Sequence, residues 1–184
     1  ELSWSELKRQ SASLALHLKA QGVKRGDRVA AYLPNIIETM IAFFATASIG
    51  GVWSLCAPDM GTAAVLDRFK QIEPKVLIAC DGYRYGGVAH DRRAVVAELV
   101  EQLPSVTHVV WHSLLSSGVA PAWPPRITPH DLAALLGGAA PLFAADQLET
   151  KPQGEQFVMI SPVKAPVYDS LYLKEGDRLA IIGD

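Results

Sequence analysis

The segment CDGYRYGG, residues 80–87, places one arginine and two tyrosines among three glycines, directly after an apolar run. The guanidinium of Arg84 is a planar fork of donors that suits a phosphate group. Gly86 and Gly87 let backbone amides approach an anion, and tyrosine rings are able to stack on a base. These residue types favour a phosphorylated, nucleotide-like ligand.

A structural interpretation of the same segment stays open on the residues alone. The tyrosines would then cover the edge of a sheet, and Arg84 would pair with Asp81 or Asp91 at the surface. Spacing alone favours this structural interpretation.

The elements that would position this segment alternate along residues 1–112. Short, largely apolar runs predict four strands, and helical patterns separate them. The strands are expected at 28–33, 51–56, 75–80 and 106–112. Helices are expected at the N-terminus, where Ser3 and Glu6 have capping-box spacing, after Asn35, and at 62–73 and 91–103. The alternation is typical of right-handed βαβ units, so the sequence predicts an α/β layered domain with a mainly parallel sheet.

Ligands of open parallel sheets bind beyond the carboxyl ends of the strands. Two loops of interest lie there: CAPDMG at 56–61, after the second strand, and CDGYRYGG, after the third. If these two strands are neighbours in the sheet, the loops lie side by side.

Two stretches carry a resemblance to a known family. Residues 26–54, from GDRVAAYLPN to GGVWS, and residues 53–87, from WSLCAPDMG to DGYRYGG, followed by DRR, resemble the N-terminal subdomain of acetoacetyl-CoA synthetases. These are adenylate-forming acyl-CoA synthetases, and the resemblance covers residues 1–112. It implies that ATP and acetoacetate, or a similar short acid, form an acyl-adenylate, from which the thiol of CoA displaces AMP.

The resemblance also implies roles for residues of this chain. In relatives the two loops line the route of CoA, so Arg84 would hold a CoA phosphate. Ala57, Pro58 and Asp59 would contact the pantetheine or nucleotide part of CoA. Where the family usually continues DGYRYGG with a lysine, this chain has Val88. We therefore expect weaker CoA binding at this loop than in other members.

Other parts of the ligase machinery lie downstream in relatives. Their ATP phosphates are bound by a Ser/Thr/Gly-rich loop ending in Pro-Lys, and the nearest match here, SSGVAP at 116–121, has no threonine pair and no lysine. The cofactors implied by the family are CoA and ATP with Mg²⁺. We nevertheless expect no ATP site, no metal ligand and no catalytic residue in this chain, which would be inactive alone.

The composition changes after His112. Residues 113–127 are rich in proline, serine and glycine and predict a linker. A short helix is expected from Thr128 to Gly137, and residues 128–184 as a whole are expected to form this helix and a β-rich tail. The tail loosely resembles half of a biotinyl/lipoyl-type domain, but Lys164 lacks the flanking residues of a modified lysine. A tail from a truncated or rearranged gene also stays open.

Composition excludes several classes. The chain is 49% hydrophobic with a net charge of -2, which predicts a globular protein without a nucleic-acid or anionic-membrane surface. The uncharged stretch 39–58 is long enough to span a membrane, but its glycines and hydroxyls favour a buried helix followed by a buried strand. Two isolated cysteines, Cys56 and Cys80, and the absence of a signal-peptide pattern predict a cytoplasmic protein with reduced thiols. The five histidines show no ligand spacing.

Two functional hypotheses follow. The first is a portion of an acyl-CoA ligase that acts on a short acid and CoA. The second is a non-catalytic α/β module that binds a nucleotide-like ligand or a protein partner. An apolar face left exposed by absent subdomains would lead to self-association in the second case.

Overall fold

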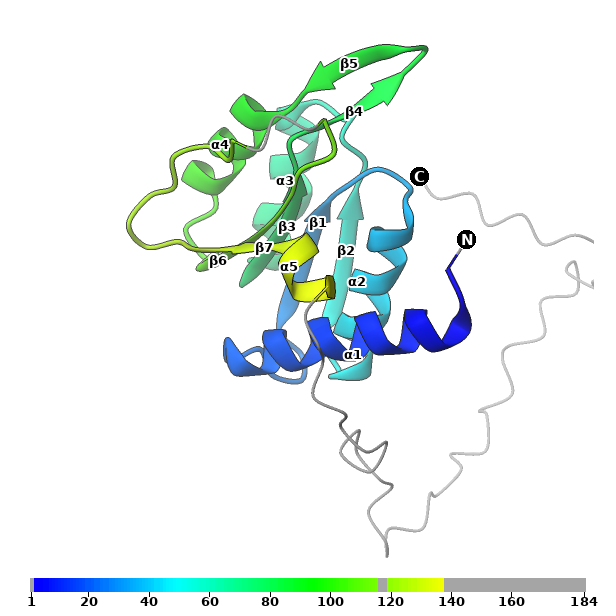
Figure 1. Ribbon diagram of the computed structural model, residues 1–184. Helices are drawn as coiled ribbons and strands as arrows, with labels where there is room; N and C mark the ends of the chain where they lie inside the picture. Colours follow the sequence, from blue (N-terminus) through cyan, green and yellow to red (C-terminus); the bar gives the residue numbers. More distant parts are fainter. Residues whose placement is uncertain (1, 116–118, 138–184) are drawn as a thin grey trace, which may run out of the picture. The chain divides into compact units, whose positions relative to one another are not determined.

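The computed structural model describes residues 2–115 and 119–137. They form a five-stranded sheet with helices on both faces, and a separate two-stranded hairpin (Figure 1). The helices are α1 (Trp4–Ala20), α2 (Ile37–Ser48), α3 (Thr62–Ile72), α4 (Arg93–Gln102) and α5 (Leu132–Gly137). The sheet strands are β1 (Arg28–Tyr32), β2 (Val52–Cys56), β3 (Val76–Cys80), β6 (His108–His112) and β7 (Thr128–Asp131). The hairpin is β4 (Gly82–Tyr85) with β5 (Val88–Asp91).

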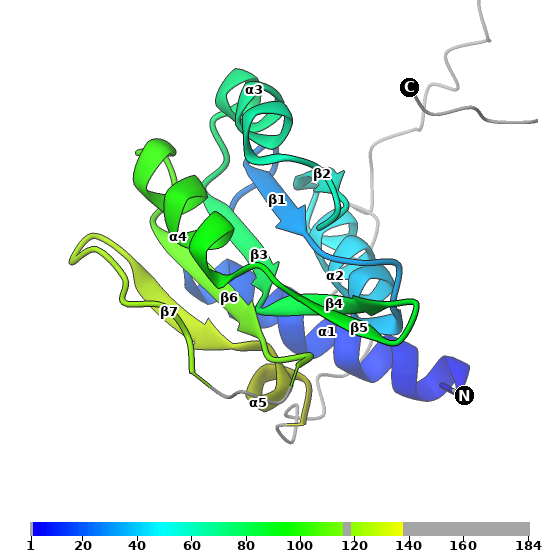
Figure 2. The same cartoon turned by 90° about the horizontal axis from the view of Figure 1, so that it is seen from above.

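The sheet is parallel throughout, with the strand order β2-β1-β3-β6-β7. The predicted α/β layered fold with a parallel sheet is confirmed. β3 is buried at every position because it lies at the centre of the sheet, which explains its uninterrupted apolar sequence. Figure 2 shows α1 and α2 on one face of the sheet and α3 and α4 on the other.

Two apolar cores separate the sheet from these helices. On the first face, Leu14 and Leu18 of α1 pack with Ile41 of α2 against inward-facing residues of β1 and β3. On the second face, Phe69 of α3 and Leu99 of α4 pack against the alternate residues of the same strands. Because successive side chains of a strand point to opposite faces of the sheet, each strand contributes residues to both cores.

The stretch 39–58 forms α2 and β2, as expected for a buried helix and strand. Within the described residues, no helix combines the length and apolar character that a membrane crossing requires. Cys56 and Cys80 are both buried and free, as predicted. Ser3 accepts a hydrogen bond from the amide of Glu6 over 3.2 Å, which confirms the predicted helix cap.

The predicted start of the last helix is wrong. Residues 128–131 form β7, in which Thr128 pairs with His108, and the helix begins only at Leu132. Pro129 is tolerated because β7 is an edge strand. The carboxylate of Asp131 accepts a hydrogen bond from the amide of Ala134 over 2.8 Å, so Asp131 caps the helix in place of Thr128. The strands predicted after residue 156, and Lys164, lie outside the described residues.

Candidate functional site at the switch point of the sheet

The strand order creates a topological switch between β1 and β3. After β1 the chain passes through α2 to β2 on one side, and then through α3 to β3 on the other side of β1. Connections that leave two adjacent strands in opposite directions open a crevice beyond their carboxyl ends, where doubly wound proteins bind ligands. The segment that follows β3 is CDGYRYGG, so the structure brings it to this position.

The segment forms a β-hairpin, which the sequence did not predict. Gly86 and Gly87, with φ of 56° and 82°, make its two-residue turn, as expected for a tight hairpin connection. At its base a Cβ on Gly82 would lie 2.2 Å from the carbonyl oxygen of His90 on the paired strand. The hairpin projects beyond the carboxyl ends of the sheet strands (Figures 1 and 2).

Arg84 is exposed on this hairpin. Its guanidinium makes no hydrogen bond or ion pair with residues 2–115 or 119–137. Asp91 instead pairs with Arg93, and the carboxylate of Asp81 accepts hydrogen bonds from the amides that follow β6. The surface pairing that we considered for Arg84 is therefore not formed with either aspartate, and its donors are available to a ligand.

The loop after β2 is held by its backbone. Ala57 and Asp59 are exposed, whereas Pro58 is buried. The hydroxyl of Tyr32, at the end of β1, donates to the carbonyl oxygens of Pro58 over 2.9 Å and of Met60 over 3.2 Å. Burial raises the pKa of Tyr32 to about 12, so this hydroxyl remains a donor at neutral pH.

The two loops would lie side by side only if β2 and β3 were neighbours in the sheet, but β1 lies between these strands. Arg92 nevertheless connects the two loops. Its Nε donates to the carbonyl oxygen of Pro58 over 2.6 Å, and its Nη2 donates to the hydroxyl of Tyr83 over 3.3 Å. Sequence reasoning missed the roles of Arg92 and Tyr32; the DRR that follows the hairpin was the available signal.

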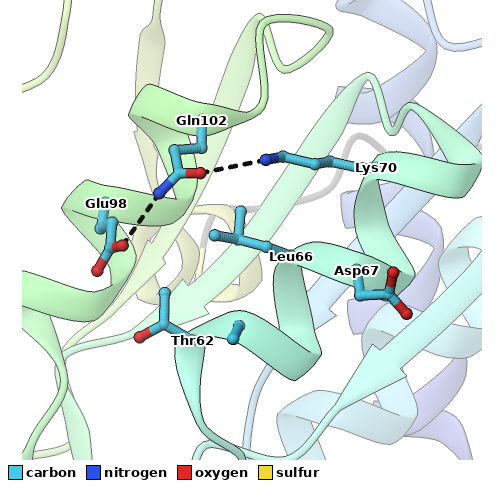
Figure 3. A pocket seen from close by; sticks show the side chains of 7 residues that line it. Thr62, Leu66, Asp67, Lys70, Glu98 and Gln102 are labelled. Carbon is cyan, nitrogen blue, oxygen red and sulfur yellow. Dashed lines mark hydrogen bonds between the residues drawn. The ribbon is translucent and has the colours of Figure 1, made fainter.

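A shallow groove between α3 and α4 contains none of the predicted site residues. Its floor is crossed by a short hydrogen-bonded chain in which Lys70 donates to Gln102 over 3.1 Å and Gln102 donates to Glu98 over 3.0 Å (Figure 3). These exposed polar groups satisfy one another, and the groove presents no arrangement suited to a phosphate.

Three histidines with no regular spacing come together on the α1 face of the sheet. His130 Nε2 lies 3.4 Å from His108 Nδ1, and the ring of His17 meets that of His130 edge-on at 4.4 Å between centroids. His108 and His130 make this contact with each other, whereas Nε2 of His17 and both ring nitrogens of His112 are buried without a hydrogen-bond partner among the described residues; the clustering was not predicted. Within the described residues, no group of three or more histidine, cysteine or acidic residues is arranged to hold a metal ion.

Comparison with known proteins identifies the family of this chain. The family described as AMP-binding enzyme matches residues 1–151. The chain belongs to the AMP-binding enzymes. The match continues past residue 112, where the resemblance seen in the sequence ended, and includes β7 and α5.

The chain is similar to part of several acetoacetyl-CoA synthetases. It is 45% identical to acetoacetyl-coenzyme A synthetase of Rhizobium meliloti (strain 1021) over 120 residues, which is 65% of this chain and 18% of the relative. It is 42% identical to acetoacetyl-CoA synthetase of Xenopus tropicalis over 60% of this chain and 16% of the relative. The structure of acetoacetyl-CoA synthetase from Streptomyces lividans matches with a TM-score of 0.69 at 50% identity, over 74% of this chain and 20% of that one. The chain thus spans about one fifth of the proteins it matches.

Proposed function

We propose that this chain is the CoA-binding portion of an acid–thiol ligase that activates acetoacetate or a similar short acid. The relatives are named for acetoacetyl-CoA synthesis, and the family match over residues 1–151 includes both candidate loops. The single observation that carries the proposal is the exposed guanidinium of Arg84 at the switch point, which has no hydrogen-bond or ion-pair partner among the described residues. In the ligase, the carboxylate of the acid would attack the α-phosphorus of Mg²⁺-bound ATP, which would give the acyl-adenylate and release pyrophosphate, away from the two candidate loops.

The residues present fit a phosphorylated thiol carrier. Arg84 supplies unused charged donors, and a charge-assisted contact of arginine with phosphate is among the stronger hydrogen bonds. The exposed Ala57 and Asp59 lie on the loop that Arg92 ties to the hairpin, where they would meet the rest of CoA. CoA, when bound, supplies the thiol nucleophile. The candidate residues would bind and orient CoA rather than touch the reacting atoms.

Calorimetric titration of the 184-residue chain with CoA and with ATP tests the proposal. We expect weak CoA binding and no measurable ATP binding. Arg84→Ala should lower CoA affinity about 10- to 100-fold, since a hydrogen bond to a charged group contributes about 1.5–3 kcal/mol.

Arg25→Ala is the matched control, because Arg25 is also exposed but precedes β1, at the amino end of the sheet. It removes the same charge and should leave CoA binding unchanged. Equal losses in the two variants would show that only net charge matters. Tight ATP binding without CoA binding would overturn the assignment of the loops.

A second candidate function, an interaction module, is favoured by one exposed apolar face. We define the α2–β2 face by five exposed apolar residues: Ile37, Met40, Phe43, Phe44 and Leu55. β2 is an edge strand, paired only with β1 among the described strands, so one row of its backbone groups has no sheet partner. A two-fold axis beside β2 would pair it with the β2 of a second copy and bury both apolar faces. We infer that the chain self-associates through this face.

Light scattering coupled to size-exclusion chromatography tests this inference over a range of concentrations. A dimer should form as the concentration rises, and Leu55→Lys, in the middle of the edge strand, should abolish it. Trp4→Lys is the control, because Trp4 is 76% exposed and lies outside the face. A monomer at every concentration, or a dimer that Leu55→Lys leaves intact, would contradict self-association through β2.

A further inference from the structure

We propose that Arg92 is a positioning residue: it fastens the β4–β5 hairpin to the loop after β2 and thereby presents Arg84 to CoA. The inference rests on the proposed function for its ligand, but the fastening itself stands on the contacts of one side chain. Arg92 lies between β5 and α4, directly at the base of the hairpin.

The guanidinium of Arg92 contacts three separate backbone or side-chain acceptors. Nε donates to the carbonyl oxygen of Pro58 over 2.6 Å, Nη1 to that of Asp91 over 3.3 Å, and Nη2 to the hydroxyl of Tyr83 over 3.3 Å. The guanidinium carbon also lies 5.2 Å from the centroid of the Tyr83 ring, within the range of a cation–π contact. In addition, the backbone amide of Arg92 donates to the carbonyl oxygen of Asp81 over 2.7 Å. One residue thus joins both strands of the hairpin, the end of β3 and the β2 loop.

The hairpin needs such an attachment because it is not part of the main sheet. β4 and β5 pair only with each other among the described strands. An isolated two-stranded hairpin is marginally stable in water. The attachment through Arg92 therefore decides how firmly the hairpin is held above the switch point.

The side-chain alternation of β4 explains how a contact to Tyr83 orients Arg84. Consecutive residues of a strand point to opposite faces, so fixing Tyr83 toward the body of the protein directs Arg84 away from it. Two contacts hold the Tyr83 side chain: Arg92 donates to its hydroxyl, and His90 of β5 stacks on its ring at 4.8 Å between centroids. Arg84 is exposed, whereas Tyr83 is half-buried.

The geometry separates the roles of the two arginines. Each nitrogen of Arg92 already donates to a protein acceptor, whereas Arg84 makes no such bond within residues 2–115 and 119–137. Arg84 is the residue that touches the ligand, and Arg92 acts through the hairpin. A lysine in place of Arg92 would keep the charge, but its single ammonium does not reproduce the planar fork that reaches Pro58 and Tyr83 together.

Hydrogen exchange measured by mass spectrometry tests the fastening without any ligand. Arg92→Ala and Arg92→Lys should both accelerate amide exchange in residues 82–91 at least tenfold, and leave β3 and β6 unchanged. Tyr83→Phe, which removes one acceptor, should produce a smaller acceleration. Arg84→Ala should produce none. Unchanged exchange of the hairpin in both Arg92 variants would overturn the proposal; if Arg92→Ala unfolds the chain, Arg92→Lys and Tyr83→Phe decide by the same criterion.

Titration of the same variants with CoA tests the consequence. Arg92→Lys should lose CoA affinity by the same factor as Arg92→Ala, because the geometry is lost in both. If Arg92→Lys binds CoA as the unmodified chain does while Arg92→Ala does not, Arg92 acts by its charge, and positioning is refuted. If exchange accelerates as expected but the unmodified chain does not bind CoA, the proposed function fails and the fastening stands.

Discussion

The cluster of His17, His108 and His130 makes the stability of this domain depend on pH. His17 comes from α1, and the other two come from neighbouring strands of the sheet. Burial lowers the pKa of all three, and for His130, where repulsion by the other two imidazoles adds to burial, the pKa falls to about 4. Lys75, the charged neighbour of His108, lowers the pKa of that histidine further. The folded state therefore favours neutral imidazoles.

The sign and size of the effect follow from linkage. A histidine titrates near pH 6.5 in the unfolded chain, so between pH 6.5 and about 4 the unfolded state binds a proton that the folded state does not bind. The contribution of His130 is complete above pH 6.5 and is lost as the pH falls through this window. With the pKa of His130 lowered to about 4, the free energy of unfolding should fall by about 2 kcal/mol between pH 7 and pH 5. Because solvent partly reaches the ring, we expect a smaller loss of about 1 kcal/mol.

Urea denaturation between pH 5 and pH 7 measures the contribution of His130 to the free energy of unfolding. We expect the free energy of unfolding of His130→Gln to fall less over this range than that of the unmodified chain, by about 1 kcal/mol. His90→Gln is the control, because His90 is outside the cluster and stacks on Tyr83 of the hairpin. The lowered carboxyl pKa values, such as that of Asp27, affect stability at more acidic pH and do not enter this window. Identical pH slopes for the unmodified chain and His130→Gln would refute the reasoning.

Three further predictions concern the candidate site. Gly82→Ala should displace the hairpin and cost about 1–3 kcal/mol of unfolding free energy, because its Cβ would lie 2.2 Å from the His90 carbonyl oxygen. Thermal unfolding measures this loss. Gly61→Ala is the control and should cost far less, because the space around Gly61 is open. Tyr32→Phe removes the donor to the Pro58 carbonyl oxygen and should cost about 1 kcal/mol in the same assay, whereas Tyr85→Phe, at an exposed position, should cost nothing measurable. Val88→Lys restores the cation usual at this position in the family and should tighten CoA binding severalfold in calorimetry; no gain would argue against CoA at the hairpin.

Much of the fold could be predicted from the sequence because the central strands are buried on both faces. Such strands are short apolar runs, as in VLIAC of β3, and helices separate them along the chain. β7 was missed because TPHD has no strand-like composition, and its pairing depends on the edge offered by β6. The hairpin was missed because its residues pack on no core, although two consecutive glycines at its centre are a known hairpin signal.

The candidate site required information that no local pattern contains. Alternation of helices and strands does not determine strand order, and the insertion of β1 between β2 and β3 separates the two loops by one strand. The carbonyl oxygen of Pro58 joins the two loops, because it accepts hydrogen bonds from Tyr32 at the end of β1 and from Arg92 at the base of the hairpin. In the sequence, Tyr32 is one more residue of an apolar strand and Arg92 one more surface cation. Both side chains bond to a backbone oxygen, that of Pro58, and a sequence motif of side chains does not reveal such a contact. Through this oxygen, the loop after β2 is connected to the hairpin that carries Arg84.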